Sequence, residues 1–528
     1  MEIFSFSPFG YEGLLVTVEV DLRRGIPAVD LVGLADNAVK ESRERMRSAI
    51  RNSGFDFPLE RILISLSPAD IRKEGSGFDL AIALAVLGEK NKEVVPRLRE
   101  KGRVLVMGEL ELSGNVRGVR GVHAAVSTAL EKGFSFCIIP KENQQEVSEI
   151  GQDASGNTEI KIFPVSSLEE AFEVISTLPE EFFCTKEEKR KASFPEKIEF
   201  DEVFADSDLS VVKKQNVLLR GMELAAAGGH NLLAYGPPGC GKTLALQRFS
   251  SIIPLLNREE GRSVTRIYSL AGLIPAGGKA LKTAPFRQPH QSSSLEGMIG
   301  GGPQCRPGEI SLAHNGVLFL DEASEFKPSV LQSLRIPLET GSIFLSRAGR
   351  HTTFPARFQL LLATNPCPCG NLGSSEHICT CPPQNVQRFW RKFSAPFLDR
   401  IDLRIPVYEN FRLEMESFIC DDSFLEKERF SSAEIQKKVE KARRIQFQRQ
   451  NCLNSHLLPE QMEKICSLTD RIKTLLMEEG EKNNFSKRGI ESCVKIARTI
   501  ADLDESAEIR ENHMEEAIIF RKNCGFEF

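Results

Sequence analysis

The feature that most constrains this chain is a glycine-rich loop placed between an apolar run and a helix-forming run. The loop reads Gly-Pro-Pro-Gly-Cys-Gly-Lys-Thr from Gly236 to Thr243, after the apolar residues 231–235 and before residues 244–249. Glycines let backbone N–H groups approach phosphate oxygens, and the N-terminus of the following helix adds a favourable dipole. This strand–loop–helix context predicts a nucleotide-binding loop at the edge of a parallel α/β sheet.

Two further apolar segments end in polar side chains of the kind that phosphate hydrolysis needs. The run 316–320 ends in Asp321 and Glu322, and the run 358–363 is followed by Asn365. Asp321 would complete the ligand shell of Mg²⁺, Glu322 would activate the attacking water, and Asn365 would help to position that water. With the glycine-rich loop, these segments resemble those of an AAA+ ATPase.

The residues expected to hold ATP and Mg²⁺ lie in the loop and at the end of the first of these strands. Lys242 would reach the β- and γ-phosphates, and Thr243 would bind Mg²⁺ together with Asp321. The predicted nucleotide-binding residues are Gly236, Pro237, Pro238, Gly239, Cys240, Gly241, Lys242, Thr243 and Asp321.

Composition restricts the class of protein. The 528 residues are 41% hydrophobic and 27% charged, which is typical of a globular protein of about three to four domains. No apolar run approaches the about 18 residues that cross a bilayer, and no basic segment precedes the first apolar residues. We therefore expect a cytoplasmic protein with no membrane partner. Thirteen cysteines, an odd number, fit a reducing compartment better than a disulfide framework.

Patterning along the chain predicts an α/β fold with three domains. Residues 14–22 and 61–66 have the character of strands, and 36–52 and 78–87 that of helices. The expected order is an α/β domain over 1–178, a charged linker over 179–200, an AAA+ core with a parallel sheet over 201–408, a linker over 409–430 and an all-α lid over 431–528.

Four motifs narrow the family. They are Gly-Gly-His-Asn at 228–231, Phe-Arg-Gln-Pro-His at 286–290, the segment 307–316 and Ala-Arg-Thr-Ile-Ala-Asp-Leu at 497–503. With them the chain resembles the ComM/YifB family of magnesium-chelatase-like AAA+ proteins over nearly its whole length. The resemblance implies a hexameric ring, ATP-driven movement on single-stranded or branched DNA, and branch migration during natural transformation, with recombination proteins as possible partners.

Two arginines are candidates for completing the ATPase site. Arg400, within Phe-Leu-Asp-Arg-Ile-Asp at 397–402, is similar to the arginine finger that one AAA+ subunit inserts into its neighbour's site. Arg488, after Ser486 and Lys487, resembles the sensor arginine of the helical lid. The alternative for each is an ordinary surface ion pair.

Two basic segments precede the strand that leads to Asn365. Five Lys/Arg and no acid lie between 262 and 295, around a glycine-rich stretch at 272–278 that we expect to interrupt a helix. Four arginines and one glutamate lie between 335 and 357, where 343–354 is expected to form a hairpin. Such projections suit phosphate contacts in a ring pore; the alternative is loops that contact neighbouring subunits. The candidate DNA contacts are Lys279, Lys282, Arg287, Arg347 and Arg350.

Four cysteines form a compact group within an insert at 366–383. Cys367 and Cys369 precede a Gly- and Ser-rich stretch, and Cys379 and Cys381 follow it. Four thiolates complete a tetrahedral Zn²⁺ site and would fold a loop that has no other core. We expect structural zinc, with His377 as a possible replacement for one sulfur and reduced free thiols as the alternative.

The N-terminal domain carries glycine-rich motifs at 69–80 and 108–121 that resemble the proteolytic domain of Lon. That fold uses a Ser-Lys dyad, but its nucleophile position falls here on Gly77 and its lysine position on His123. A substitute pair of Ser76 and His123 would be displaced by one residue. We therefore expect no protease activity.

Several classes of function are weighed. A DNA-translocating ATPase is favoured. The alternative is the ATPase subunit of a metal-chelatase-type remodelling complex without DNA activity, which the Lon-like domain and the cysteine insert fit less well. The missing dyad opposes an ATP-dependent protease. A non-enzymatic scaffold is opposed by Lys242, Asp321 and Glu322.

Overall fold

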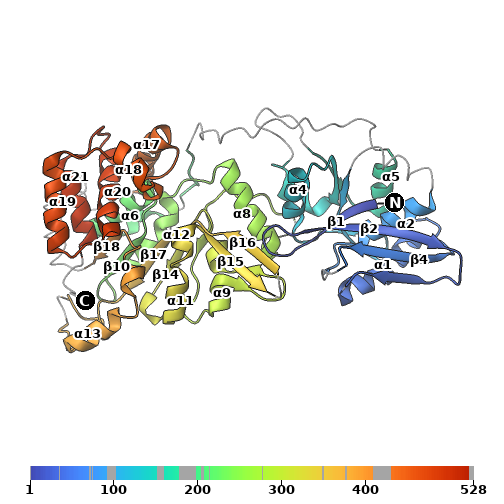
Figure 1. The fold of residues 1–528 in the computed structure, drawn as a ribbon, viewed down its shortest axis with the longest axis horizontal. Coiled ribbons are helices and arrows are strands. Elements are labelled where there is room, and N and C mark those ends of the chain that lie inside the picture. Colours follow the sequence, from blue (N-terminus) through green and yellow to red (C-terminus); the bar gives the residue numbers. More distant parts are fainter. Residues whose placement is uncertain are drawn as a thin grey trace.

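The structure is a computed structural model, and three connected lobes follow one another along its longest axis (Figure 1). It describes residues 2–34, 36–69, 73, 75–91, 103–150, 160–177, 198–203, 207–212, 215–275, 277–347, 350–374, 377–407 and 430–522. Most of the two expected linkers, 179–197 and 409–429, lies outside the described residues. None of the helices within these ranges is long and apolar enough to cross a bilayer.

The N-terminal lobe is built on a mixed seven-stranded sheet of order β3-β4-β2-β1-β5-β8-β9. Its strands are β1 (Glu2–Ser7), β2 (Leu14–Arg23), β3 (Val29–Val32), β4 (Arg61–Ser67), β5 (Val104–Val106), β8 (Phe136–Pro140) and β9 (Lys161–Val165). A short hairpin, β6 (Glu109–Leu110) and β7 (Val116–Arg117), occupies the glycine-rich segment before α4.

Helices cover both faces of this sheet because the side chains of its strands alternate between them. Val104 and Val106 belong to the core cluster that contains α1 (Asn37–Asn52), α2 (Asp79–Lys90) and α5 (Leu168–Ser176). Leu105, between these valines, belongs to the cluster that contains α4 (Val122–Glu131). The strands and helices expected in this lobe are therefore present, with bounds that shift by one to three residues.

The central lobe contains a five-stranded parallel sheet of order β11-β14-β17-β10-β18. The strands are β10 (Leu232–Tyr235), β11 (Phe286–Arg287), β14 (Val317–Leu320), β17 (Gln359–Thr364) and β18 (Leu403–Pro406). Its longer helices are α6 (Asn216–Gly228), α7 (Lys242–Gln247), α8 (Arg258–Ala271), α11 (Pro328–Ser333) and α13 (Pro383–Trp390). The parallel sheet expected from the sequence is confirmed.

The C-terminal lobe is helical and shares a core with the central sheet. It comprises α17 (Ser432–Gln450), α18 (Pro459–Ile465), α19 (Asp470–Lys482), α20 (Lys487–Leu503) and α21 (Glu511–Arg521). One continuous apolar cluster joins Leu232 and Ile405 of the sheet to Val439 of α17 and Ile496 of α20. The lid therefore packs directly on the ATPase-type core.

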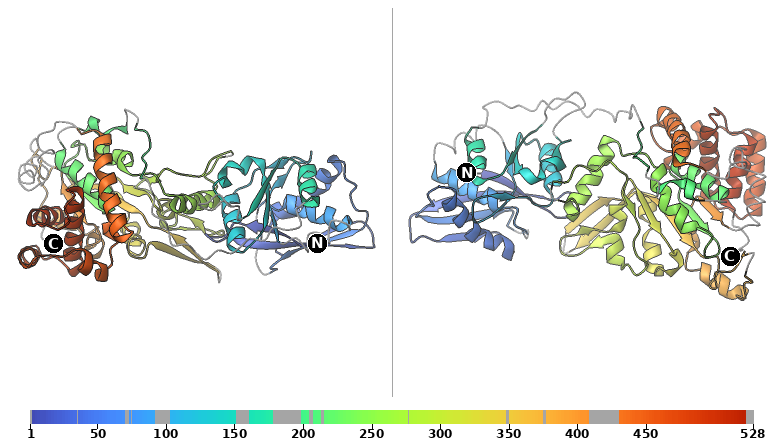
Figure 2. Two further views of the ribbon diagram at one scale, coloured as in Figure 1. Left: turned by 90° about the horizontal axis from the view of Figure 1, so that it is seen from above. Right: turned by 180° about the vertical axis from the view of Figure 1, so that it is seen from behind.

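The N-terminal lobe meets the central lobe chiefly through α8, which lies beside α4 in all views (Figures 1 and 2). Arg266 of α8 is 7% exposed; its Nη1 donates to Glu131 at 2.8 Å and its Nη2 to Thr128 Oγ1 at 3.0 Å. Its guanidinium also lies 4.7 Å from the ring centroid of Tyr11. The basic residues at this end of the 262–295 segment therefore join two lobes.

The expectation of a helix interrupted at 272–278 is wrong for the residues that the structure describes. Helix α8 ends at Ala271 and is capped by Gly272, whose φ of +72° is left-handed, and the next helix, α9 (Leu295–Ile299), begins only at Leu295. A glycine in this conformation is a common helix stop because it has no Cβ to clash with the backbone. In contrast, the hairpin is present as β15 (Ser342–Arg347) and β16 (Arg350–Pro355).

Candidate nucleotide site and metal centre

Three strands of the central sheet bring the predicted catalytic segments to one edge. Tyr235 of β10 pairs with Thr364 of β17, and Leu320 of β14 pairs with Leu362 of β17. Because the strands are parallel, the residues that follow them emerge on the same side. The glycine-rich loop, Asp321 and Asn365 therefore start from adjacent positions.

The glycine-rich loop closes around the ammonium group of its own lysine. Gly239 and Gly241 have φ values of +81° and +83°, a region that residues with a Cβ rarely adopt. Lys242 begins α7, and its Nζ donates to the carbonyl oxygens of Gly236 and Pro237, both at 2.7 Å. The loop thus has the curved backbone and the internal cation that phosphate binding requires.

The two predicted ligands of Mg²⁺ are in contact. Thr243 Oγ1 donates a hydrogen bond to Asp321 Oδ1 over 3.0 Å, although 78 positions separate the residues in sequence. A hydroxyl and a carboxylate are the hard oxygen donors that Mg²⁺ prefers, together with substrate phosphates and water. The donor set therefore fits this ion.

Glu322, the predicted base, has a strained backbone. Its φ and ψ of 49° and 46° lie in the left-handed region, and its N–H donates to Asp321 Oδ1 at 3.0 Å. A non-glycine residue in this region costs about 1–3 kcal/mol and is typical of functional sites. Asp321 thus contacts Thr243, while Glu322 starts the next turn.

The structure brings Arg400 and Arg488 together at a residue that sequence reasoning missed. Arg400 Nη2 donates to Glu339 Oε2, and Arg488 Nη1 lies 3.9 Å from Glu339 Oε1. Glu339 belongs to α12 (Pro337–Thr340), just before the β15–β16 hairpin. One exposed carboxylate thus links the core, the lid and the base of the hairpin.

The segment around Arg400 is also attached to the lid through its two aspartates. Ser486 Oγ, which caps α20, donates to both carboxylate oxygens of Asp399 at 2.8 Å. Ser492 Oγ donates to Asp402 at 2.6 Å, and the ring of His230 lies 3.4 Å from the same carboxylate. Burial opposes ionisation of Asp402, but the hydrogen bond with His230 holds the pKa of its carboxyl below its usual range.

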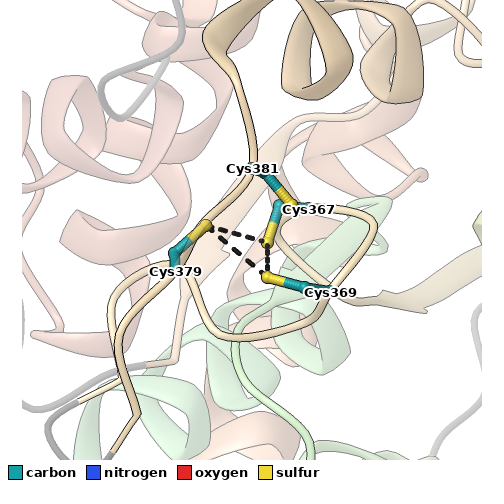
Figure 3. Close-up of side chains that lie close together, drawn as sticks. All are labelled: Cys367, Cys369, Cys379 and Cys381. Carbon is teal, nitrogen blue, oxygen red and sulfur yellow. Dashed lines mark hydrogen bonds between the residues drawn. The ribbon is translucent and has the colours of Figure 1, made fainter.

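The four cysteines form a cluster whose sulfur atoms all lie within 4.8 Å of one another (Figure 3). The sulfur of Cys367 lies 3.4 Å from that of Cys369 and 3.6 Å from that of Cys379. Tetrahedral zinc with Zn–S distances near 2.3 Å requires sulfur separations of about 3.8 Å. The arrangement fits a four-thiolate zinc site, in which Cys381 supplies the fourth ligand and His377 is not needed.

The cysteine cluster lies next to the phosphate loop. Cys367 follows Asn365 by two residues, and a Cβ built on Gly370 would lie 3.1 Å from Cδ of Pro238. On the other side, Trp390 Nε1 donates to the carbonyl oxygen of Pro366 at 2.9 Å. The cluster is therefore placed to support both the loop and the position of Asn365.

A large cleft lies away from the phosphate loop. It has a volume of about 850 Å³, and its lining includes Gly316 and Gln359, which stand at the start of β14 and β17. Arg443 and His456 line its lid side. Because it opens at the amino edge of the sheet, the length of the strands separates it from the phosphate loop.

Family comparison agrees with this geometry. Residues 208–415 match the family described as magnesium chelatase, subunit ChlI; 18–143 match subunit ChlI of Mg-chelatase; and 429–521 match its C-terminal family. The chain is 38% identical to the uncharacterized protein YifB of Escherichia coli (96% of this chain, 94% of that protein). It is 36% identical to the competence protein ComM of Haemophilus influenzae (98% and 97%).

The chain belongs to the ComM/YifB family of magnesium-chelatase-like AAA+ proteins. The three matched segments fall in the three lobes of the structure, so the family covers the N-terminal lobe as well as the core and lid. In addition, the chain is 27% identical over 168 residues to the Lon protease of Clostridioides difficile (30% of this chain, 20% of that protein). This match supports the Lon-like character of the N-terminal domain.

The Lon-like lobe of this ComM/YifB chain does not pair Ser76 with His123 among the described residues. Ser76 Oγ donates instead to Glu109 Oε2. His123 is 1% exposed, its backbone N–H donates to Glu146 at 3.1 Å, and burial lowers the pKa of its imidazole to about 3. Ser76 is thus bonded to a carboxylate, and no hydrogen bond joins it to the enclosed imidazole of His123 among the described residues.

The candidate DNA contacts of this family member do not form one cluster. Arg287 lies in β11, and its Nε and Nη2 donate to the carboxylate of Glu309 at 2.7 and 2.8 Å, so a contact of Arg287 with DNA would have to compete with this ion pair. Lys282 pairs with Glu149 at 3.1 Å, and Lys279 is exposed. Arg347 and Arg350 face each other in the hairpin register, and their side chains lie outside the described residues.

Sequence reasoning also missed an aromatic pair on the hairpin. Phe344 is 65% exposed, and its ring stacks on that of His351 with centroids 5.3 Å apart and an interplanar angle of 19°. The alternation of the expected hairpin could have revealed it, because it places Phe344 on the face of the hairpin that points to solvent.

Proposed function

We propose that this chain is the subunit of a hexameric, ATP-driven DNA motor that promotes branch migration in recombination during natural transformation, in the cytoplasm. The observation that carries the ATPase part is the contact of Thr243 with Asp321 beside the glycine-rich loop. The full-length similarity to a competence protein supports the biological setting. We assign no protease activity to the N-terminal lobe.

Each residue of the nucleotide site has a defined task in this proposal. Loop N–H groups and Lys242 bind the triphosphate, while Thr243 and Asp321 hold Mg²⁺, which neutralises phosphate charge when bound. Glu322 accepts the proton of the attacking water, and Asn365 orients that water. Placement of all these groups after adjacent parallel strands supports the assignment.

A neighbouring copy of the chain supplies the remaining positive charge of the ATPase site. Arg400, aided by Arg488, would stabilise the negative charge that develops on the transferred phosphoryl group. The two arginines lie at a shared carboxylate, and within the described part of the chain no hydrogen bond or ion pair joins them to Lys242 or Asp321. This placement supports action across a subunit boundary, which requires a ring.

The β15–β16 hairpin is the proposed DNA-gripping element. Arg347 and Arg350 at its tip would contact phosphates, and the exposed stack of Phe344 on His351 offers an aromatic surface for bases. Lys279 remains a further candidate, since the structure leaves it exposed. Such contacts are largely independent of base sequence and sensitive to salt.

We further propose that Cys367, Cys369, Cys379 and Cys381 hold a structural Zn²⁺. The backbone N–H of Asn371 lies 3.5 Å from the sulfur of Cys369 and lowers the pKa of that thiol, which favours the thiolate form that binds zinc. With four protein ligands no coordination position stays open, so the ion would support the fold and not take part in hydrolysis.

The alternative is the ATPase subunit of a chelatase-type remodelling complex without DNA activity, favoured by the family descriptions that match all three lobes. The deciding experiment measures ATP hydrolysis with no DNA and with single-stranded, duplex and branched DNA, and follows strand displacement in parallel. A DNA motor is expected to hydrolyse ATP faster with DNA and to displace strands in an ATP-dependent manner. Equal rates in all four conditions, with no displacement, would favour the chelatase-type alternative.

A further inference from the structure

Glu339 is the meeting point of two arginines that come from different lobes. Arg400 donates to one of its carboxylate oxygens, and Arg488 approaches the other to 3.9 Å. The side chain of Glu339 is 57% exposed, and that of Arg488 is 40% exposed. Glu339 and Arg488 are therefore accessible to solvent, whereas Arg400 is largely covered.

Apart from the bond to Glu339, only some of the hydrogen-bond donors of the Arg400 guanidinium have partners among the described residues. Its side chain is 11% exposed, its Nη1 donates to the carbonyl oxygen of Pro396 at 2.6 Å, and its buried Nε has no partner among the described residues. Glu339 is the one carboxylate that bonds its guanidinium within the described chain. Removal of this anion would leave a nearly enclosed cation that needs a replacement.

The backbone around these arginines holds them in a fixed relation. Ser486 binds Asp399, the residue before Arg400, and lies two positions before Arg488. Arg521 of α21 also donates to Asp399, at 2.9 Å. Hydrogen bonds between the core and the lid therefore lie next to both arginines.

We propose that Glu339 is an internal counter-ion that keeps Arg400 and Arg488 aligned in the separate subunit, and that the triphosphate bound to a neighbouring subunit displaces it when the ring assembles. This inference rests on the proposed ring ATPase. Arginine binds carboxylates and phosphates through the same fork of N–H donors, so one anion can replace the other without a change of rotamer. An exposed carboxylate contributes little to such a pair, whereas a triphosphate carries more charge.

The charges around Glu339 keep its carboxyl group ionised. The hydrogen bond from Arg400 is the main reason why the pKa of this carboxyl is lowered, and the charges of Arg488 and Arg335 act in the same direction. Glu339 is thus ionised at neutral pH. In Glu339→Gln the three arginines lose their shared anion, and the cationic face then attracts a phosphate group more strongly.

The test is the subunit concentration at which ATP drives assembly, measured by sedimentation and by the concentration dependence of ATP hydrolysis. Glu339→Gln is expected to lower this concentration about two- to fivefold, the range for an exposed ion pair. Glu505→Gln, which removes another exposed carboxylate paired with Lys441 at 2.8 Å, is the matched control and should behave as wild type.

A concentration that is unchanged or higher in Glu339→Gln, while wild type assembles with ATP, would overturn the inference and leave the ring ATPase intact. Failure of wild type to assemble or hydrolyse ATP would instead overturn the proposed function. If Glu339→Gln unfolds, Glu339→Asp serves as the second variant. Its shorter carboxylate cannot bridge both arginines, so a smaller decrease is expected, and no decrease contradicts the proposal.

Discussion

The hydroxyl of Thr243 and the carboxylate of Asp321 lie 3.0 Å apart at the edge of the central sheet, at the ends of a loop and a strand that are distant in sequence. This contact brings two oxygen ligands to the place where the glycine-rich loop ends and α7 begins. A Mg²⁺ ion bound there would also touch the phosphates that the loop holds.

Three substitutions at this site should separate binding from hydrolysis. Lys242→Ala is expected to abolish nucleotide binding, because the ammonium group is the cation inside the loop. Asp321→Asn should raise the Mg²⁺ concentration for half-maximal hydrolysis about tenfold or more, since a charged ligand is lost.

Glu322→Gln should bind ATP normally and hydrolyse it about 10²–10⁴-fold more slowly. Fluorescent nucleotide titration and phosphate release measure the two steps; normal hydrolysis in Glu322→Gln would remove its assignment.

Arg400→Ala should retain ATP binding and lose turnover by about 10³-fold, because an arginine finger acts only on the transition state. Mixing provides a sharper test. Arg400→Ala keeps an intact phosphate loop, and Lys242→Ala keeps an intact Arg400, so mixed rings contain some complete sites. Hydrolysis by the mixture should exceed that of either variant alone. A mixture that stays as inactive as its components would place Arg400 outside the neighbouring site.

Purified protein should contain about one zinc per chain, measured by elemental analysis. Cys379→Ser should lose most of that zinc and unfold at a lower temperature, because its sulfur lies 3.6 Å from those of Cys367 and Cys369. Since Gly370 of this loop lies beside Pro238 of the phosphate loop, ATP should also bind more weakly. Cys452→Ser, a half-buried thiol of the lid, is the control. Zinc-free wild type of full stability would reject the metal centre.

The hairpin is expected to grip single-stranded DNA in two distinguishable ways. Phe344→Ala should weaken binding by about 1–3 kcal/mol with no change in salt dependence, since a stacked base is lost. Arg347→Ala combined with Arg350→Ala should instead reduce the slope of log affinity against log salt concentration, by the amount expected for the loss of about two phosphate contacts. Met477→Ala, exposed on α19, controls for loss of apolar surface. Binding curves that match wild type at every salt concentration would exclude this hairpin.

Arg266 is expected to hold the N-terminal lobe to the central one. Arg266→Met removes hydrogen bonds to Glu131 and Thr128 and a cation–π contact with Tyr11, and should lower the free energy of unfolding by about 1–3 kcal/mol. Urea unfolding measures this change. Arg444→Met, at an exposed pair with Glu440 on α17, should cost less than about 0.5 kcal/mol. Equal effects of the two substitutions would show that the lobe contact adds no stability.

Local sequence determined most of the elements and the nucleotide motif. The strands β2 and β4 and the helix α1 lie within one residue of their expected bounds, because their hydrophobic periodicity is strong and each lies between turn or capping signals. The glycine pattern before Lys242 was sufficient to predict the nucleotide-binding loop, since only glycine adopts the positive φ values of this loop at low cost.

Tertiary structure decided which charges are paired and with what. Arg287 and Arg266 read as members of a basic segment, but packing places one against Glu309 and the other against the N-terminal lobe. Glu339 gave no signal, because its importance arises only where the core brings Arg400 and the lid brings Arg488 to the same carboxylate. Periodicity reports which face of an element is buried, whereas the partner of a polar side chain depends on elements that are far apart in the chain. The physical reason is that contacts between segments remote in sequence determine such pairs. A sequence pattern does not give the distance in space between two remote residues.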